Sequence, residues 1–387
     1  GQEVYDWTVP KEWNIKNAWI KNSKGERVID FKNSNLHIVS YSIPVNEKLR
    51  LIDFKDHLFF LENSPDAIPY RTSYYNETWG FCLSFNDYEK LFSDDNEEFE
   101  IFIDSSLENG SLSIGELIIE GKGKKEYLLS SYICHPSMLN DSMSGAIAAT
   151  FIAKELLEKQ QQLEHSYRII FVPETIGAIA YCANNEKEMK GIDNGLVLTT
   201  CGGPGQYGYK QSWDKSNFIN GMIEDVFKDN GIEFLTYPFD IHGSDERQYS
   251  SQGFKINCAT ISKDKYYEYD YYHTSLDNLA FVKADNLNKT VNLYLQLIDK
   301  MDKNIVYTNL QKNCEVMLSK HGLYPKTGGA LLPNSEVSAL DIVLWNLFYM
   351  DGSISLYEIS KKINVDIALV YYEAKKLESI NITKVCE

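Results

Sequence analysis

The spacing of apolar residues changes character along the chain, and its first part reads as short strands. Between residues 26 and 119, apolar and polar positions alternate in stretches such as ERVIDF, NLHIVSYSIPV and EEFEIFID, with turn-forming residues between them. A period of two predicts strands with one buried face. One helical stretch, roughly residues 51–61, interrupts them. We therefore expect a β-rich module at residues 26–119.

From Glu126 onward, mostly apolar strands alternate with helices. The strands are EYLLSSYIC, YRIIFVPE, GLVLTT and INCATIS, and the main helices are SGAIAATFIAKELLEKQQQL, SNFINGMIEDVFKDNG and ADNLNKTVNLYLQLIDKMDK. Strands buried on both faces and separated by helices are typical of a parallel sheet covered on both sides. The predicted fold class is α/β, a mostly parallel sheet flanked by helices, formed by residues 1–25 and 120–320.

The last part of the chain, residues 330–387, has three short helical patterns and a closing strand: ALDIVLWNLFYM, SLYEISKKI, DIALVYYEAKKLES and INITKV. This order predicts a winged-helix-like domain, a fold that in DNA-binding proteins places one helix in the major groove. From Glu336 on there are five Lys, no Arg and eight acidic residues, a net charge of −3 (5 − 8). We therefore expect a structural or protein-contacting role rather than DNA binding.

The charge of the whole chain also argues against binding to DNA. Its 387 residues carry a net charge of −17, which disfavours nucleic acid and anionic membranes as partners. No apolar run approaches the ~18 residues of a membrane helix. The seven cysteines are scattered without a C-x-x-C pair, as in a reduced compartment. The chain is expected to be soluble and cytoplasmic, with assembly into a homo-oligomer left open.

Two candidate metal ligands follow the first strand of the α/β segment. His135 comes directly after EYLLSSYI, and Asp141 leads into the next helix. An imidazole and a carboxylate six residues apart, at the carboxyl end of a strand, suit a divalent cation such as zinc. Two structural alternatives stay open: a core histidine bonded to a backbone carbonyl, and an aspartate that caps the helix.

Two further candidates also follow strands. Glu174 ends RIIFVPE beside a glycine turn, where desolvation would raise its pKa and suit it to act as a general base. The alternative is an acid favoured by the dipole of the following helix. His273 follows an acidic aromatic run, and it could equally be an ordinary half-buried residue. Asp277, four residues later, is a candidate cap of the last helix of the segment.

A fifth polar stretch, HGSDER, precedes the strand INCATIS. Arg247 could bind a substrate carboxylate through two hydrogen bonds, and Asp245 could orient a ligand histidine. His242 and Glu246 lie in the same stretch and are candidates for contact with the substrate or the ligands. A solvated turn is the alternative.

The order of these elements resembles the zinc aminopeptidases, whose α/β core is phosphorylase/hydrolase-like. The motifs CHPSMLNDSMSG, GSDERQY and YHTSLDN, with the N-terminal DWTVPKEW and AIPYRTSYY, are more closely similar to an aminopeptidase-like family of uncharacterised function. That resemblance implies an inserted β-rich domain, a C-terminal winged helix and a link to polysaccharide biosynthesis. It covers nearly the whole chain.

The resemblance also implies roles for the candidate residues. His135 and His273 match the two metal-binding histidines, Asp141 matches the aspartate that bridges two metals, and Glu174 matches the general base. Two positions depart from the pattern. Thr175 stands where a ligand glutamate is expected, and the strand GLVLTT ends in threonines where a ligand aspartate is expected. A single divalent metal, zinc, is therefore the expected cofactor.

The preferred hypothesis is a metal-dependent hydrolase of amide bonds, aminopeptidase-like, that acts on a small peptide or an N-acylated small molecule. One alternative is an N-acyl sugar deacetylase of polysaccharide biosynthesis, which would use the same chemistry. The other is a catalytically degenerate protein that binds a ligand or serves as a scaffold. Fold analogy does not choose the substrate.

Overall fold

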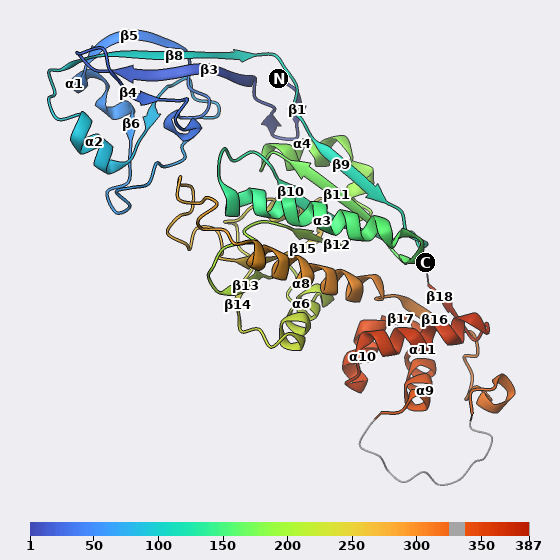
Figure 1. Cartoon of the computed structure of the whole chain (residues 1–387). Helices are drawn as coiled ribbons and strands as arrows, with labels where there is room; N and C mark the ends of the chain where they lie inside the picture. The colour runs from blue at the N-terminus through green and yellow to red at the C-terminus, as the bar shows by residue number, and fades with distance from the viewer. Residues whose placement is uncertain (325–336, 387) are drawn as a thin grey trace.

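The structure, a computed structural model, describes residues 1–324 and 337–386. Three parts follow one another along the molecule: an N-terminal β-rich module, a central α/β core and a C-terminal helical domain (Figure 1). The expected start of the C-terminal domain, residue 330, lies outside the described residues.

The N-terminal module is built on a four-stranded antiparallel sheet. Its strands, in spatial order, are β4 (Arg27–Asp30), β3 (Glu12–Lys21), β8 (Glu98–Glu108) and β5 (Val45–Arg50). Apolar side chains of β3 and β8 pack with the short helices α1 (Leu51–Phe54) and α2 (Phe85–Leu91). The helix expected at 51–61 is shorter, because it ends in the 3₁₀ turn Lys55–His57 and the strand β6 (Leu58–Phe59).

Strand pairing moves both expected boundaries of this module. β3 pairs with β8 from Glu12 opposite Glu108, so the sheet of the module begins well before residue 26. At the other end, β9 (Gly115–Ile119) pairs with a strand of the core and belongs to the core sheet. The pairing of β3 joins segments almost a hundred residues apart, which alternation along the chain does not reveal.

The core holds a seven-stranded sheet in the order β14-β13-β15-β12-β10-β11-β9. β10 pairs in parallel with β11 and β12, as does β12 with β15 and β13 with β14, whereas β9 and β13 run antiparallel to β11 and β15. The prediction of a mostly parallel sheet flanked by helices is confirmed. The strands not yet bounded are β10 (Glu126–Tyr132), β11 (Ser166–Val172), β12 (Asn194–Val197), β13 (Tyr207–Lys210), β14 (Phe234–Tyr237) and β15 (Asn257–Lys263).

Helices cover both faces of this sheet. The apolar faces of α3 (Ser144–Glu158), α6 (Phe218–Asp229) and α8 (Ala284–Asp302) form one buried cluster with the strands. α4 (Ile176–Asn184) packs on the opposite face, together with the short α5 (Glu186–Met189) and α7 (Glu246–Tyr249). Within the described residues, every helix is too short or too polar to cross a membrane.

The C-terminal domain contains the three helices and the closing strand that its pattern predicts. They are α9 (Ala339–Tyr349), α10 (Leu356–Ile363), α11 (Ile367–Ser379) and β18 (Thr383–Val385). Its sheet, in the order β17-β16-β18, also uses β16 (Val306–Asn309) and β17 (Asp351–Ser355). β16 lies inside the range 120–320 that was expected to belong to the core, so this domain begins earlier than predicted.

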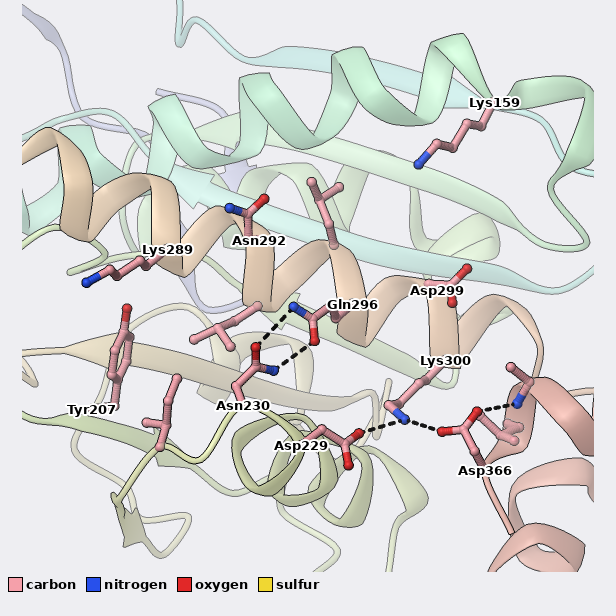
Figure 2. Close-up of a pocket in the computed structure, with 15 residues that line it drawn as sticks. Lys159, Tyr207, Asp229, Asn230, Lys289, Asn292, Gln296, Asp299, Lys300 and Asp366 are labelled. Carbon is pink, nitrogen blue, oxygen red and sulfur yellow. Dashed lines mark hydrogen bonds and ion pairs between the residues drawn. The ribbon is translucent and has the colours of Figure 1, made fainter.

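A polar cleft of about 930 Å³ lies where the core meets the C-terminal domain (Figure 2). Lys300 on α8 lies 3.1 Å from Asp229 of the core and 3.0 Å from Asp366 of the C-terminal domain. Asn230 and Gln296 pair with each other beside it. None of the expected site residues lines this cleft. The ion pairs of Lys300 connect the two domains across it, so we interpret it as a joint between domains.

Candidate metal centre

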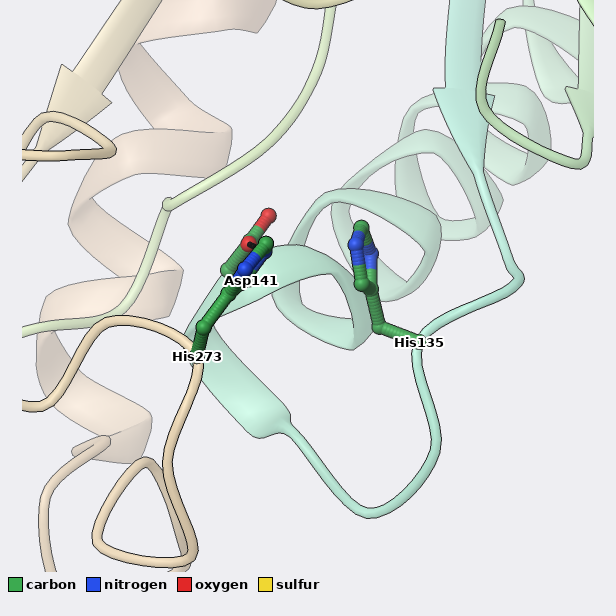
Figure 3. A group of neighbouring side chains, drawn as sticks. All are labelled: His135, Asp141 and His273. Carbon is green, nitrogen blue, oxygen red and sulfur yellow. Dashed lines mark ion pairs between the residues drawn. The ribbon is translucent and has the colours of Figure 1, made fainter. Parts of the chain in front are cut away.

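His135, Asp141 and His273 lie together above the carboxyl ends of the core strands. His135 is on the loop after β10, Asp141 is in the turn that leads into α3, and His273 is on the loop between β15 and α8. Their side chains extend in the same direction from these separate loops (Figure 3). One ligand atom of each lies within 4.8 Å of those of the other two. The fold thus gathers the three residues that the sequence singled out as metal ligands.

Several donor atoms of this cluster have no hydrogen-bond partner. Oδ2 of Asp141 lies 3.1 Å from Nε2 of His273, yet neither atom makes a hydrogen bond, and Nδ1 of His135 has none either. Buried polar atoms are normally paired. Two imidazoles and a carboxylate form a donor set that zinc uses. The residues present therefore fit a divalent metal ion.

The protonation states also suit a cation. Burial lowers the pKa of His135 and outweighs the opposing charge of Asp141, so the His135 imidazole is neutral near pH 7. Burial opposes ionisation of Asp141, but His135 and His273 outweigh it and lower the pKa of the carboxyl group. A neutral imidazole and an ionised carboxylate are the forms that bind metals.

The turn that carries Asp141 is held by Asp277. The two carboxylate oxygens of Asp277 accept hydrogen bonds from the backbone amides of Asn140 at 2.6 Å and Asp141 at 2.9 Å. The expectation that Asp277 caps the next helix is wrong, because the N-cap residue of α8 is Lys283. Nor does Asp141 cap α3, whose N-cap residue is Met143. Both carboxylates lie at the cluster rather than at a helix N-terminus.

Only one oxygen of Asp141 faces the cluster. Tyr132, the last residue of β10, donates its hydroxyl to Oδ1 of Asp141 at 2.5 Å. The hydroxyl of Thr199 lies 2.7 Å from that of Tyr132 and 3.4 Å from the same Oδ1. Oδ2 therefore remains as the free donor. Sequence reasoning missed Tyr132, because nothing in the pattern of a strand buried on both faces distinguishes its end.

Glu174 follows β11 and faces this cluster. Its Oε2 lies 3.6 Å from Nε2 of His135, and its backbone amide donates to Sγ of Cys134 at 3.2 Å. Burial, followed by the charges of Asp245 and Asp141, raises the pKa of the Glu174 carboxyl well above its usual value. The side chain is 25% exposed, so it stays open to solvent. A carboxyl group with a raised pKa beside a candidate metal position suits proton transfer.

The turn after Glu174 is fixed by Asp245. Thr175 adopts a positive φ of 62°, and its backbone amide donates to Oδ1 of Asp245 at 2.7 Å. Asp245 is fully buried, and burial raises the pKa of its carboxyl group. The exposed Arg247 reaches the hydroxyl of Thr175 at 3.4 Å. Asp245 and Arg247 therefore lie beside the turn that carries Glu174.

The other two residues of this stretch lie apart from the cluster. Glu246 makes a buried ion pair with Lys210 at 2.8 Å and accepts a hydrogen bond from Tyr266 at 3.1 Å. The side chain of His242 is exposed and is absent from the group of ligand atoms found among the described residues. The structure thus does not bring Glu246 or His242 to the metal position.

Two tyrosines that sequence reasoning did not place at the site border the cluster. The ring of Tyr272 stacks on that of His273 with centroids 3.9 Å apart. Tyr70, from the N-terminal module, lies edge-on to His135 and His273, with centroids 5.5 and 5.3 Å away. Tyr70 belongs to the segment AIPYRTSYY that carried part of the family resemblance, but its position depends on how the module folds against the core.

The fold and this cluster define an aminopeptidase-like protein with a C-terminal winged helix. A family model described as a domain of unknown function, DUF4910, matches residues 1–304, and a winged helix-turn-helix model matches residues 305–384. The chain belongs to the DUF4910 family. The resemblance inferred from the sequence is confirmed.

The relatives support a peptidase-like hydrolase. A Clostridium acetobutylicum protein, described as a polysaccharide biosynthesis protein with an aminopeptidase-like domain, is 42% identical over 99% of this chain and 86% of its own. The crystal structure of a candidate peptidase from Clostridium acetobutylicum superposes with a TM-score of 0.84 at 40% identity, over 100% of this chain and 86% of that one. BSAP, a zinc aminopeptidase from Bacillus subtilis, shares the fold with a TM-score of 0.57 at 13% identity, over 76% and 83% of the two chains.

Proposed function

We propose that this chain hydrolyses amide bonds with a single divalent metal ion, zinc, held by His135, Asp141 and His273. The observation that carries the proposal is the group of three ligand residues whose donor atoms lie within 4.8 Å of one another, several of them buried and without hydrogen bonds. Three protein ligands leave a fourth position open, as in catalytic zinc sites. When bound, zinc would activate water and polarise the carbonyl group of an amide.

Asp141 supports one metal rather than two. A bridging aspartate needs both oxygens for metals, but Oδ1 of Asp141 already accepts the Tyr132 hydroxyl at 2.5 Å. Thr175 and Thr199 offer hydroxyl groups where the two-metal enzymes that the sequence resembles have carboxylates. Neutral hydroxyls are poorer ligands for a second zinc ion than the carboxylates they replace.

Glu174 is the proposed general base. Its carboxylate faces His135 at 3.6 Å, which supports a role within one water molecule of the proposed metal ion. It would take a proton from the attacking water and pass it to the nitrogen of the leaving amine. Asp245 holds the neighbouring Thr175 amide at 2.7 Å and so keeps Glu174 pointing toward the centre.

The proposed substrate is a small peptide or an N-acylated small molecule, cleaved at its amide bond. A deacetylase of N-acylated sugars is the second candidate, and the description of the Clostridium acetobutylicum relative as a polysaccharide biosynthesis protein favours it. Both reactions use the same water, the same base and the same amide chemistry.

The test is hydrolysis by the zinc-loaded chain of aminoacyl amides and of N-acetylated amino sugars. Glu174→Gln keeps the shape of the side chain and removes the proton acceptor, so the rate should fall by at least about 10²-fold with unchanged metal content. Glu77→Gln, at an exposed position of the N-terminal module, is the matched control and should keep the full rate. If the chain hydrolyses neither substrate class at full metal occupancy, it is a ligand-binding or scaffold protein instead.

A further inference from the structure

A loop of the N-terminal module is bonded directly to the loop that carries His273. The amide of Tyr70 donates to the carbonyl of His273 at 2.8 Å, and the amide of Ser275 donates to the carbonyl of Ile68 at 2.9 Å. The amide of Ile68 in turn donates to the hydroxyl of Ser275 at 3.0 Å. These bonds form a short antiparallel bridge around Pro69. The module is therefore fixed relative to the candidate metal position.

The N-terminal module contributes four aromatic rings near this bridge, here called the aromatic row: Tyr70, Tyr74, Tyr41 and Trp13. Tyr70 lies edge-on to both metal-binding histidines. Tyr74 follows in the same loop, with its ring centroid 6.0 Å from that of Tyr41, which in turn stacks on Trp13 at 6.0 Å with an angle of 19°. Tyr74 is 54% exposed. The row thus presents aromatic surface to solvent next to the site.

The row stays uncharged and borders the reacting groups. Partial burial, followed by the neighbouring Cys134 and Glu174, raises the pKa of Tyr74 to about 12. Tyr70 is buried more deeply, and Tyr74, Cys134 and Glu174 raise its pKa as well. Both phenols are therefore neutral near pH 7. The geometric link to the centre is Tyr70, four residues before Tyr74 in the same loop, whose ring contacts those of His135 and His273.

We propose that Tyr74, supported by Tyr41 and Tyr70, is a stacking subsite for an uncharged ring of the substrate, next to the amide bond that is cleaved. A flat aromatic face binds a flat partner most favourably, because such a partner buries the most apolar surface against it. The carboxylates of Asp141 and Glu174 beside the row disfavour an anionic group in this position. The ring is the pyranose of an N-acylated sugar or the aromatic side chain of an aminoacyl group. This inference rests on the proposed function, because it takes the substrate to lie at the same centre.

Measurements of binding, rather than of hydrolysis, distinguish the stacking subsite from the proposed hydrolytic function. Calorimetry on the zinc-loaded Glu174→Gln chain would compare phenylalaninamide with glycinamide, and N-acetylglucosamine with N-acetylethanolamine, so that each ring ligand has a partner without the ring. One ring ligand should bind about three- to tenfold more tightly than its partner, and the pair that shows this identifies the source of the ring. Tyr74→Phe should keep this preference, and Tyr74→Ala should remove most of it.

Tyr75→Ala is the matched control. Tyr75 is 53% exposed in the same loop, but it pairs with Trp7 and with the carbonyl of Thr8 outside the row. The preference should survive in Tyr75→Ala. Equal binding of both ring ligands and their partners overturns the inference, as does an equal effect of Tyr74→Ala and Tyr75→Ala. Absence of hydrolysis in the unmodified chain, with the ring preference intact, would contradict the proposed function and leave the stacking subsite standing.

Discussion

Oδ2 of Asp141 lies 3.1 Å from Nε2 of His273, and neither atom makes a hydrogen bond. A protonated Nε2 at this distance would be expected to donate a hydrogen bond to Oδ2, but the two groups do not form one. If Nε2 carries no proton, two lone pairs face each other in a buried place. A cation between them would satisfy both atoms, which makes this contact the most direct sign of a metal position in the structure.

The first prediction concerns these ligands. His273→Ala removes one of three donors, so bound metal should fall from about one per chain to near zero, because two remaining ligands hold zinc weakly. Elemental analysis of protein purified without chelator measures this. His242→Ala is the control, since its imidazole is exposed and outside the cluster. Metal content that survives in His273→Ala would contradict the assignment.

The second prediction concerns the number of metal ions. The unmodified chain should hold close to one divalent ion, and Thr175→Ala should leave that number unchanged, because Thr175 is tied to Asp245 through its backbone. Titration with zinc, followed by removal of excess metal and elemental analysis, gives the value. A stoichiometry near two would instead show that Cys201, Asp245 or His242 supplies a ligand to a second ion.

The third prediction concerns the support of Asp141. Asp277→Asn replaces one oxygen with an amide nitrogen that cannot accept, so either the Asn140 or the Asp141 amide loses its partner. A buried amide left unpaired costs about 1–3 kcal/mol, and stability in urea should fall by that amount. Zinc affinity should weaken as well, because the Asp141 turn is no longer held. Asp270→Asn, at an exposed position nearby, should change neither quantity.

The sequence predicts residues at strand ends better than contacts between distant segments. His135 and Glu174 each follow a long apolar strand, and the carboxyl ends of parallel strands meet at one edge of the sheet. Local order was therefore enough to single them out. His273 has no such strand directly before it, and only the resemblance to a known motif identified it as a ligand.

The contributions of Tyr70 and Tyr132 could not be predicted. Tyr70 reaches the centre through its bridge to His273, about 200 residues further along the chain, and no periodicity reports such a contact. β13 was missed for a local reason, because Tyr207–Lys210 is four residues long and contains a glycine, too short for a pattern of alternation. Non-local pairing and short strands are thus where sequence reasoning failed.

The final prediction uses His165, a buried histidine next to the C-terminal domain. Its ring lies edge-on to Tyr127 with centroids 5.3 Å apart, and neither ring nitrogen has a hydrogen-bond partner. Burial, together with the charge of Lys125, lowers the pKa of His165 from 6.5 to about 4. The neighbouring carboxyl groups also have shifted pKa values: burial raises that of Asp302, whereas Tyr371, Lys375 and Lys122 lower that of Glu164, and His165 variants keep both groups.

Because the folded pKa of His165 is lower than the unfolded one, the unfolded chain binds this proton first as the pH falls. The stability linked to His165 is complete above pH 6.5 and is lost progressively toward pH 4, by up to about 3 kcal/mol. His165→Phe keeps the ring contact and removes the titration, so its urea midpoint should change less between pH 7.5 and about pH 5 than that of the unmodified chain. His321→Gln, at an exposed position, should keep the original dependence. Equal slopes for His165→Phe and the unmodified chain would show that His165 takes up its proton at an ordinary pH in the folded state.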